Sequence, residues 1–240
     1  MKDISYYSDI LGISLSDKQL EQFNTYMNMV IEKNKVVNLT AITDPEEFHL
    51  KHFADSLSLI SAVNQASPIA NEEVSVIDVG TGAGFPAIPL KIAFPNIHLT
   101  LLDSKNKRIS FLNDVISELS LENVTTIHGR AEEGARTPEL RDNFDFAVSR
   151  AVAKMNSLSE YCLPYLKPEG YFIAYKSDNI SEELEEAKNA VFLLGAYPAE
   201  VVHFKLADSD IERSFVVIKK KTNTPNKYPR ESGSIKKSPL

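Results

Sequence analysis

Apolar and polar residues over the first 70 positions alternate with the spacing of amphipathic helices. In residues 16–34 the apolar side chains recur three or four positions apart, which places them on one helical face: Leu20, Phe23, Met27, Val30 and Ile31. Ser16 and Gln19 form the pattern of a capping box, which predicts the start of this helix. The stretch TDPE at 43–46 predicts another start, with proline at the first position and acids in the first turn. The second helix would carry Phe48, His49, His52, Phe53 and Leu57. We predict a helical region over residues 1–70, bounded by SPIANEE at 67–73.

From residue 74 the pattern changes to short apolar runs separated by helical stretches such as 105–120. The runs are rich in β-branched or aromatic residues and predict strands at 74–80, 98–104, 123–129, 144–150, 170–176, 199–207 and 213–221. Strand–helix alternation predicts a mostly parallel sheet with helices on both faces. The last two runs are too close in sequence for a parallel crossover, which needs roughly a dozen residues. They are therefore expected to form a terminal antiparallel hairpin.

Length and charge suggest how the chain is divided. The 240 residues fit one or two domains, and we expect a helical region at 1–70, an α/β domain at 71–221 and a basic tail at 222–240. The net charge of −7 argues against a nucleic-acid partner. However, residues 219–240 hold seven basic residues and one acid, which leaves −13 for residues 1–218. This tail is either a solvated, disordered terminus or an arm that binds phosphates.

The cysteine count and the hydropathy pattern exclude several classes of protein. Cys162 is the single cysteine, so neither a disulfide framework nor a multi-cysteine zinc site is possible, and no metal is expected. A reducing cytoplasm fits this composition. The first residues contain no apolar stretch typical of a secretory signal, and no run of about 18 apolar residues predicts a membrane span.

The candidate chemistry begins at residues 77–89, which read IDVGTGAGFPAIP. A glycine-rich turn between a strand and a helix allows a ligand to approach the backbone closely. The glycines Gly80, Gly82 and Gly84 follow a G-x-G-x-G pattern, which differs from the G-x-G-x-x-G of pyrophosphate binders. Asp103 ends the next predicted strand, where a carboxylate can accept hydrogen bonds from both hydroxyls of a ribose. The ligand should therefore contain a ribose. Asp78, before the glycines, is either a cofactor contact or an acid at a strand end or helix cap.

With the terminal hairpin, this layout resembles the Rossmann-like fold of S-adenosylmethionine-dependent methyltransferases. The resemblance assigns the three glycines to the methionine and ribose portion of the cofactor, and Asp103 to the ribose hydroxyls. The segment GRAEE at 129–133 follows the third strand. There Ala131 and Glu132 are candidates for reading the adenine amino group, and the alternative is an ordinary capped helix start.

The acceptor can be narrowed by what the sequence lacks. It has no Asn/Asp-Pro-Pro-aromatic run, the arrangement associated with methylation of exocyclic amines. Carbon-5 methylation of cytosine needs a thiolate nucleophile, and Cys162 lies within a predicted helix where a core position is expected. Guanine N7 already has a free lone pair, so its methylation removes no proton. A site without a base constellation is consistent with that acceptor.

Several motifs together resemble the RsmG (GidB) family of 16S ribosomal RNA guanine-N7 methyltransferases. They are DVGTGAGFPAIPL, LLDSKNKRISFL, HGRAEE, SRA and the closing YPR with KKSPL, and NLTAI and HFADSL resemble the family's N-terminal part. The chain departs from the family where Ala87 follows Phe-Pro, a position usually held by glycine. The resemblance implies that Gly80, Phe85, Ala131, Glu132 and Arg150 contact the cofactor, which leaves as S-adenosylhomocysteine.

Two of these implied roles have alternatives. Phe85 is either an apolar wall near the sulfonium or ordinary helix–sheet packing. Arg150, the only catalytic candidate, holds the methionine carboxylate or an RNA phosphate, since its planar fork suits either; otherwise it forms a structural ion pair.

Further residues are candidates for contact with ribosomal RNA or the small subunit. His52 and Asp55 share a helical face and either orient the target base or, as we favour, form a local polar contact between domains. Asn38 is either a base-reading amide or a turn residue. Lys105, Lys107 and Arg108 either flank an RNA groove or simply solvate a helix. Lys176, at the end of the fifth predicted strand, is a candidate phosphate contact, and Arg230 is a further RNA candidate.

Three other functions compete with RNA methylation. A methyltransferase acting on a protein or small molecule would suit the acidic body of the chain. An NAD-dependent oxidoreductase is disfavoured by the glycine spacing and the terminal hairpin. The last alternative is a cofactor-bound RNA-binding module without turnover.

Overall fold

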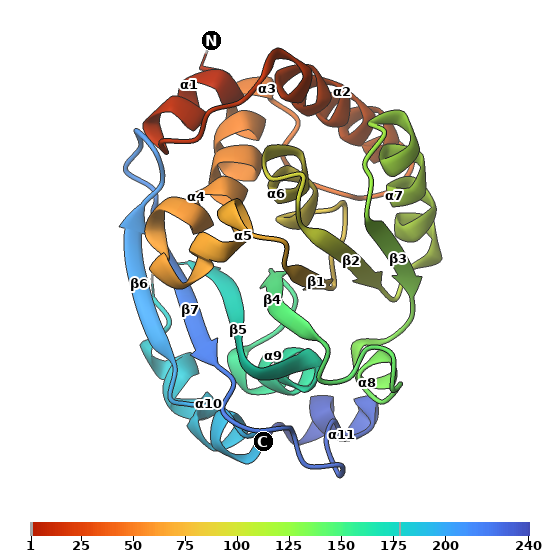
Figure 1. Ribbon diagram of the computed structural model, residues 1–240, viewed down its shortest axis with the longest axis vertical. Coiled ribbons are helices and arrows are strands. Elements are labelled where there is room, and N and C mark those ends of the chain that lie inside the picture. Colours follow the sequence, from red (N-terminus) through yellow and green to blue (C-terminus); the bar gives the residue numbers. More distant parts are fainter. Residues whose placement is uncertain (1, 178) are drawn as a thin grey trace.

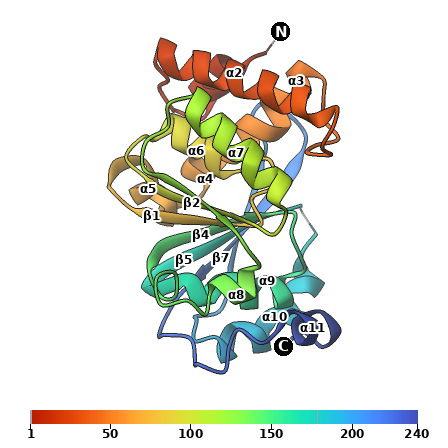
Figure 2. The ribbon, with the colours of Figure 1, turned by 90° about the vertical axis from the view of Figure 1, so that its right-hand side faces the viewer.

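A seven-stranded sheet runs through the middle of the molecule, and helices cover both of its faces (Figures 1 and 2). The structure is a computed structural model that describes residues 2–177 and 179–240. The strand order is β3-β2-β1-β4-β5-β7-β6. The strands are β1 Ser75–Val79, β2 His98–Asp103, β3 Val124–His128, β4 Phe144–Arg150, β5 Leu166–Ser177, β6 Glu200–Lys205 and β7 Glu212–Lys219. Each of the seven predicted strands is present, and the predicted fold class is confirmed.

The pairing directions also agree with the sequence prediction. Strands β1 to β5 are mutually parallel, whereas β7 is antiparallel to both β5 and β6. The central strands are buried on both faces, as the unbroken burial of Val76–Val79 in β1 illustrates. This is why they read as continuous apolar runs rather than as alternating ones.

The N-terminal helices and the first crossover helices form one covering layer (Figure 2). This layer contains α1 Ile4–Ile10, α2 Asp17–Asn34, α3 Pro45–Phe48, α4 Asp55–Ala62, α5 Ser67–Asn71, α6 Ala87–Ala93 and α7 Asn106–Glu118. The predicted capping box of α2 is present, with the Ser16 side chain accepting from the Gln19 amide. Phe23, Phe53 and Leu112 are fully buried in one apolar cluster that continues to the sheet. The helical region thus shares the core of the α/β part, and the expected boundary at 67–73 contains α5.

The opposite layer consists of α8 Ala131–Gly134, α9 Met155–Cys162, α10 Ser181–Leu193 and α11 Ser232–Lys237. Short 3₁₀ turns, η2 Asn64–Ala66 and η3 Leu163–Tyr165, precede α5 and β5. Cys162 is fully buried in the core of this layer.

A π-helix, η1 His49–Ala54, continues α3 into α4. Because a π-helix bonds each amide five residues back, it turns the side chains that follow relative to an α-helix. The sequence pattern did not predict it. His52 and Asp55, from one continuous helical segment, both reach the end of β4, as shown below.

The basic tail is ordered and packs against the second layer. Arg141 donates to the carbonyl oxygens of Thr224 and Tyr228 at 2.6 and 3.0 Å. Arg230 forms an ion pair of 2.7 Å with Glu160, whose side chain is fully buried. Ile235 of α11 has no exposed surface. Of the two interpretations of the tail, the disordered terminus therefore does not describe this structure.

Candidate functional site

The glycine run forms the loop between β1 and α6, and its backbone explains the alternating glycines. The φ angles of Gly80, Gly82 and Gly84 are +76°, +63° and +108°, a region that residues with a Cβ atom rarely adopt. Space is also limiting: a Cβ on Gly80 would lie 2.6 Å from a methyl carbon of Val152. The glycines therefore allow both the turn itself and the close packing of Val152 against it.

Asp103 ties this loop to the end of β2. Its carboxylate accepts from the Gly82 amide at 3.0 Å, from the Lys105 amide at 2.8 Å and from the Arg108 guanidinium at 3.1 Å. The side chain is almost fully buried. Three donors fix its orientation, and a carboxylate has about four acceptor positions, so one remains for a ligand hydroxyl.

A cavity of about 560 Å³ opens beside this carboxylate. Gly80, Asp103, Ala131 and Glu132, all predicted to bind the cofactor, line it together. Oxygen Oε1 of Glu132 is buried without a hydrogen-bond partner among the described residues. An unpartnered buried oxygen is unfavourable unless a ligand donates to it. These two acceptors therefore fit a nucleoside that offers a ribose hydroxyl and an exocyclic amine as donors.

The other predicted cofactor residues do not line this cavity. Gly82 and Gly84 shape the loop behind it, and Phe85 is buried in packing, with its ring stacked on His52 at 4.3 Å between centroids. Asp78 is fully buried, and among the described residues neither of its oxygens has a hydrogen-bond partner of good geometry. Burial raises the pKa of Asp78 to about 7, an effect that Thr81 partly offsets.

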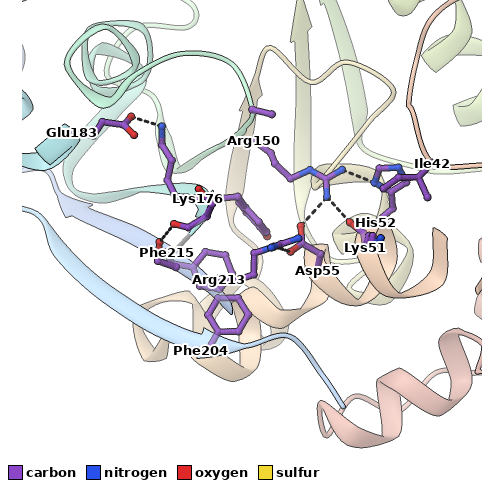
Figure 3. A pocket seen from close by; sticks show the side chains of 14 residues that line it. Ile42, Lys51, His52, Asp55, Arg150, Lys176, Glu183, Phe204, Arg213 and Phe215 are labelled. Atoms are coloured by element: carbon purple, nitrogen blue, oxygen red, sulfur yellow. Dashed lines mark hydrogen bonds and ion pairs between the residues drawn. The ribbon is translucent and has the colours of Figure 1, made fainter. Parts of the chain in front are cut away.

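Arg150, at the end of β4, lines a second cavity of about 560 Å³ (Figure 3). Its guanidinium donates to Asp55 Oδ2 at 2.8 Å and to the Lys51 carbonyl oxygen at 3.2 Å. Arg213 donates to the other Asp55 oxygen at 3.0 Å. The structure thus brings together Arg150, Asp55 and His52, as a polar contact between the helical region and the sheet.

Arg213 was not singled out in the sequence, although a signal was present. It lies at the start of β7, opposite Ser177 at the end of β5. An antiparallel last strand necessarily begins at the edge where the parallel strands end. A charged residue at its start therefore belongs to the site edge, and the predicted hairpin contained this information.

The hydrogen bonds of His52 determine its tautomer. Arg150 can only donate, so His52 Nδ1, 2.9 Å away, accepts. Nε2 must then carry the proton and donates to the Thr40 hydroxyl at 2.7 Å. Burial, together with the Arg150 charge, lowers the pKa of His52 to about 3. The imidazole is neutral and both of its nitrogens are engaged.

A loop at 151–154 separates the two cavities. Ala151 lines the cavity that contains Arg150, called the Arg150 cavity below. Val152 and Ala153 line the cavity beside Gly80 and Asp103, called the glycine-loop cavity below. Lys176, predicted to contact phosphate, donates to the Ala153 carbonyl oxygen at 3.0 Å and pairs with Glu183 at 2.5 Å (Figure 3). Glu183 also accepts from the Met155 amide at 2.6 Å. Lys176 and Glu183 together hold this loop in place.

The remaining predicted RNA contacts occupy two other places. Asn38, Lys105, Lys107 and Arg108 line one cavity of about 410 Å³ at the end of β2. Arg230 is not among them, because its side chain is engaged by Glu160 beneath the tail. Among residues 2–177 and 179–240, no cluster of His, Cys, Asp or Glu is placed to hold a metal ion. Within the same residues, no helix has the length and apolar character to cross a membrane.

A parallel sheet with a terminal antiparallel hairpin and a glycine loop facing an acid at the end of β2 defines a Rossmann-like methyltransferase. The chain belongs to the GidB family, described as rRNA small subunit methyltransferase G, whose model matches residues 19–215. Its methyl-donor cofactor is S-adenosylmethionine, as the resemblance to this family implied.

Similar proteins agree with this assignment. The ribosomal RNA small subunit methyltransferase G of Lachnoclostridium phytofermentans is 52% identical over 96% of this chain and 93% of its own length. That of Alkaliphilus metalliredigens is 49% identical over 96% and 94%. Among solved structures, MtNAS in complex with MTA and tNA has a TM-score of 0.54 at 15% identity, covering 83% of this chain and 73% of that one. Methanococcus jannaschii fibrillarin, a pre-rRNA processing protein, has a TM-score of 0.50 at 18% identity, covering 65% and 70%. These two likenesses concern the fold alone.

Proposed function

We propose that the protein methylates N7 of a guanine in 16S ribosomal RNA, as free RNA or within the small subunit. Membership of a small-subunit rRNA methyltransferase family supports the substrate class. The proposed place of action is the cytoplasm. The finer assignment, to a ring nitrogen that loses no proton, rests on the geometry of the Arg150 cavity.

The glycine-loop cavity is the proposed cofactor site. When bound, S-adenosylmethionine supplies an electrophilic methyl group on a sulfonium. Asp103, whose orientation three donors already fix, has one acceptor position left for a ribose hydroxyl. Glu132 offers a buried oxygen to the adenine amino group, and Gly80 lines the same cavity with its backbone. Asp78, Gly82, Gly84 and Phe85 support this loop from behind.

The Arg150 cavity is the proposed acceptor site. It lies at the same edge of the sheet, across the 151–154 loop from the cofactor site. Lys51, Arg150, Lys176 and Arg213 contribute four positive charges to its lining, against the negative charges of Asp55 and Glu183. An excess of positive charge suits an RNA backbone, even though the whole chain is acidic. A target base that enters has to leave its stack, as bases do when enzymes modify them.

The observation that carries the N7 assignment is the state of the cavity's acids and bases. Both oxygens of Asp55 are paired with arginines. Glu183 accepts from Lys176 and from the Met155 amide. The lone pair of His52 accepts from Arg150. Among the described lining residues, each carboxylate and the imidazole are engaged, so none is free to remove a proton. Guanine N7 needs no such removal.

Methyl transfer from labelled S-adenosylmethionine to small-subunit RNA of a strain lacking the enzyme tests the proposal. Borohydride–aniline cleavage should map the label to one N7-methylguanine. Replacement of that guanine by 7-deazaguanine in a reconstituted RNA should abolish transfer, because the accepting lone pair is gone. Label on an exocyclic amine or on carbon would contradict the N7 assignment.

A pH profile provides an independent check. Without a general base, the single-turnover rate should change less than about threefold between pH 6 and pH 9, whereas a required deprotonation would give a slope near tenfold per pH unit below its pKa. Label appearing only in protein or small molecules would favour the alternative, a methyltransferase with a different acceptor. In that case the positive cavity would bind another anionic group.

A further inference from the structure

The ordered C-terminal segment forms one wall of the glycine-loop cavity. Ser232, Lys236 and Pro239 line the same space as Gly80 and Asp103. Ser232 and Lys236 also line the adjoining hollow that contains Glu132 and Arg130. Figure 1 shows α11 next to α8, the element that carries Glu132. The tail is therefore placed against the part of the cavity where an adenine would be read.

Specific side-chain contacts hold this C-terminal segment against the second layer. Ile235 is completely buried in the apolar cluster of the second layer. Arg230 pairs through its guanidinium and its amide with Glu160, and Arg136 donates to the Pro229 carbonyl oxygen at 2.7 Å. The anchors lie immediately before α11 and on its inner face. They position Ser232 and Lys236 toward the cavity.

The position of Glu132 indicates which end of the cofactor the wall faces. Glu132, the proposed partner of the adenine amino group, lines both hollows together with Ser232 and Lys236, so the wall faces the adenosine end. The ammonium of Lys236 and the hydroxyl of Ser232 can donate to the ring nitrogens of adenine or to ribose oxygens. The free oxygen of Glu132, beside them, can accept from the amino group.

We propose that α11 is part of the cofactor site, with Lys236 and Ser232 contacting the adenosine end of S-adenosylmethionine. The inference rests on the proposed position of the cofactor in the glycine-loop cavity. It assigns the basic tail to the cofactor rather than to RNA. Because binding free energies are reciprocal, a docked tail strengthens cofactor binding and the bound cofactor strengthens docking of the tail.

The test measures S-adenosylhomocysteine binding by calorimetry, without RNA. Lys236→Ala should raise Kd roughly tenfold, the value of a lost hydrogen bond from a charged donor. Its matched control is Lys237→Ala, the exposed neighbour that does not line the cavity, and this variant should leave Kd unchanged. A chain ending at Glu231, which retains the Arg230–Glu160 pair, should bind at least as weakly as Lys236→Ala. Circular dichroism and the melting temperature of each ligand-free variant monitor folding.

A second readout follows the tail directly. Addition of S-adenosylhomocysteine to the full chain should slow hydrogen exchange at the amides of 232–238. RNA affinity of the chain ending at Glu231 should change less than twofold, whereas an RNA-binding arm would lose affinity.

Asp103→Asn separates the two possible failures. If Asp103→Asn does not weaken binding, the cofactor lies elsewhere and the proposed site itself fails. If Asp103→Asn weakens binding while Lys236→Ala and the shortened chain bind normally, the cofactor site stands and only the role of α11 is overturned.

Discussion

Asp78 has an environment that does not match what its side chain requires. It lies in the middle of the sheet near the end of β1, fully buried, and the Thr81 hydroxyl and the Ala87 amide stabilise its charged form less than burial destabilises it. Burial is the main reason that the pKa of Asp78 rises from 3.8 to about 7. A group protonated in the folded state and ionised in the unfolded state makes stability depend on pH.

The sign of this dependence can be tested with Asp78→Asn. Because the folded pKa is the higher one, wild-type stability falls as pH rises from about 4 to 7, and levels off above that. Relative to wild type, Asp78→Asn should therefore gain about 3 kcal/mol in unfolding free energy between pH 5 and pH 8. Urea denaturation at both pH values measures it. Asp114→Asn, on the exposed face of α7, should show no such gain; an equal gain in both variants would contradict the assignment to Asp78.

Individual residues also show where sequence reasoning reaches its limit. The position of Asp103 at a strand end could be predicted, because the apolar run of β2 ends there. Its place beside the glycine loop follows from the parallel pairing of β1 and β2. Arg150 was predicted to contact the cofactor or an RNA phosphate without its partners being known. The pairing of Arg150 with Asp55, 95 positions away, depends on how a helix packs against a strand end, and hydrophobic periodicity contains no such information.

At the scale of elements, the strands were predictable and the irregular segments were not. Strand positions follow from buried β-branched runs, and the hairpin follows from the shortness of its connection. The π-helix η1 looks like ordinary helix in sequence, because its residues, HLKHFA, satisfy the same periodicity over so short a span. The docked tail was equally hidden, since its composition is that of a solvated terminus. Only tertiary contacts, such as those of Ile235 and Arg230, order it.

The loop between the two cavities gives a prediction at this scale. Glu183 of α10 holds the loop through the Met155 amide and through Lys176. Removal of both contacts in Glu183→Ala should release the loop, because no other carboxylate is described as bonding to these groups. We expect at least a tenfold faster hydrogen exchange at the amides of 151–155, since about 1.4 kcal/mol of local stability corresponds to that factor. The rate of methyl transfer should fall as well.

Glu185→Ala is the matched control for the loop. Glu185 lies on the same helix, pairs at the surface with Lys188 and does not touch the loop. Its exchange rates at 151–155 should equal those of wild type. If Glu183→Ala also leaves them unchanged, the loop is held by its own packing, through Val152 against Gly80 for example, and the ion pair is incidental.

For the whole molecule, the distribution of charge says more about RNA binding than the net charge does. The chain carries −7 overall. However, the lysines and arginines of the Arg150 cavity, and those of the cavity lined by Asn38 (the Asn38 cavity), lie at the edge where the parallel strands end. The same residues spread evenly over an acidic surface would repel RNA. Gathered at one edge, they favour the proposed binding of a folded RNA on that side.

This convergence predicts a local effect on the salt dependence of RNA binding. Each lost phosphate contact with a single strand lowers the slope of log K against log salt by roughly 0.7, so Lys105→Ala with Lys107→Ala should lower it by about 1.4. Both side chains are exposed at the Asn38 cavity.

The control is the double variant Lys188→Ala with Lys227→Ala, which changes net charge equally. It removes exposed lysines that line neither the Arg150 cavity nor the Asn38 cavity, so its slope should be unchanged. Filter binding from 50 to 300 mM salt gives both slopes. S-adenosylhomocysteine affinity should remain that of wild type in both, since neither pair lines the cofactor cavity. Equal losses of slope in the two double variants would mean that RNA senses only the total charge, and the proposed binding edge would then have no basis.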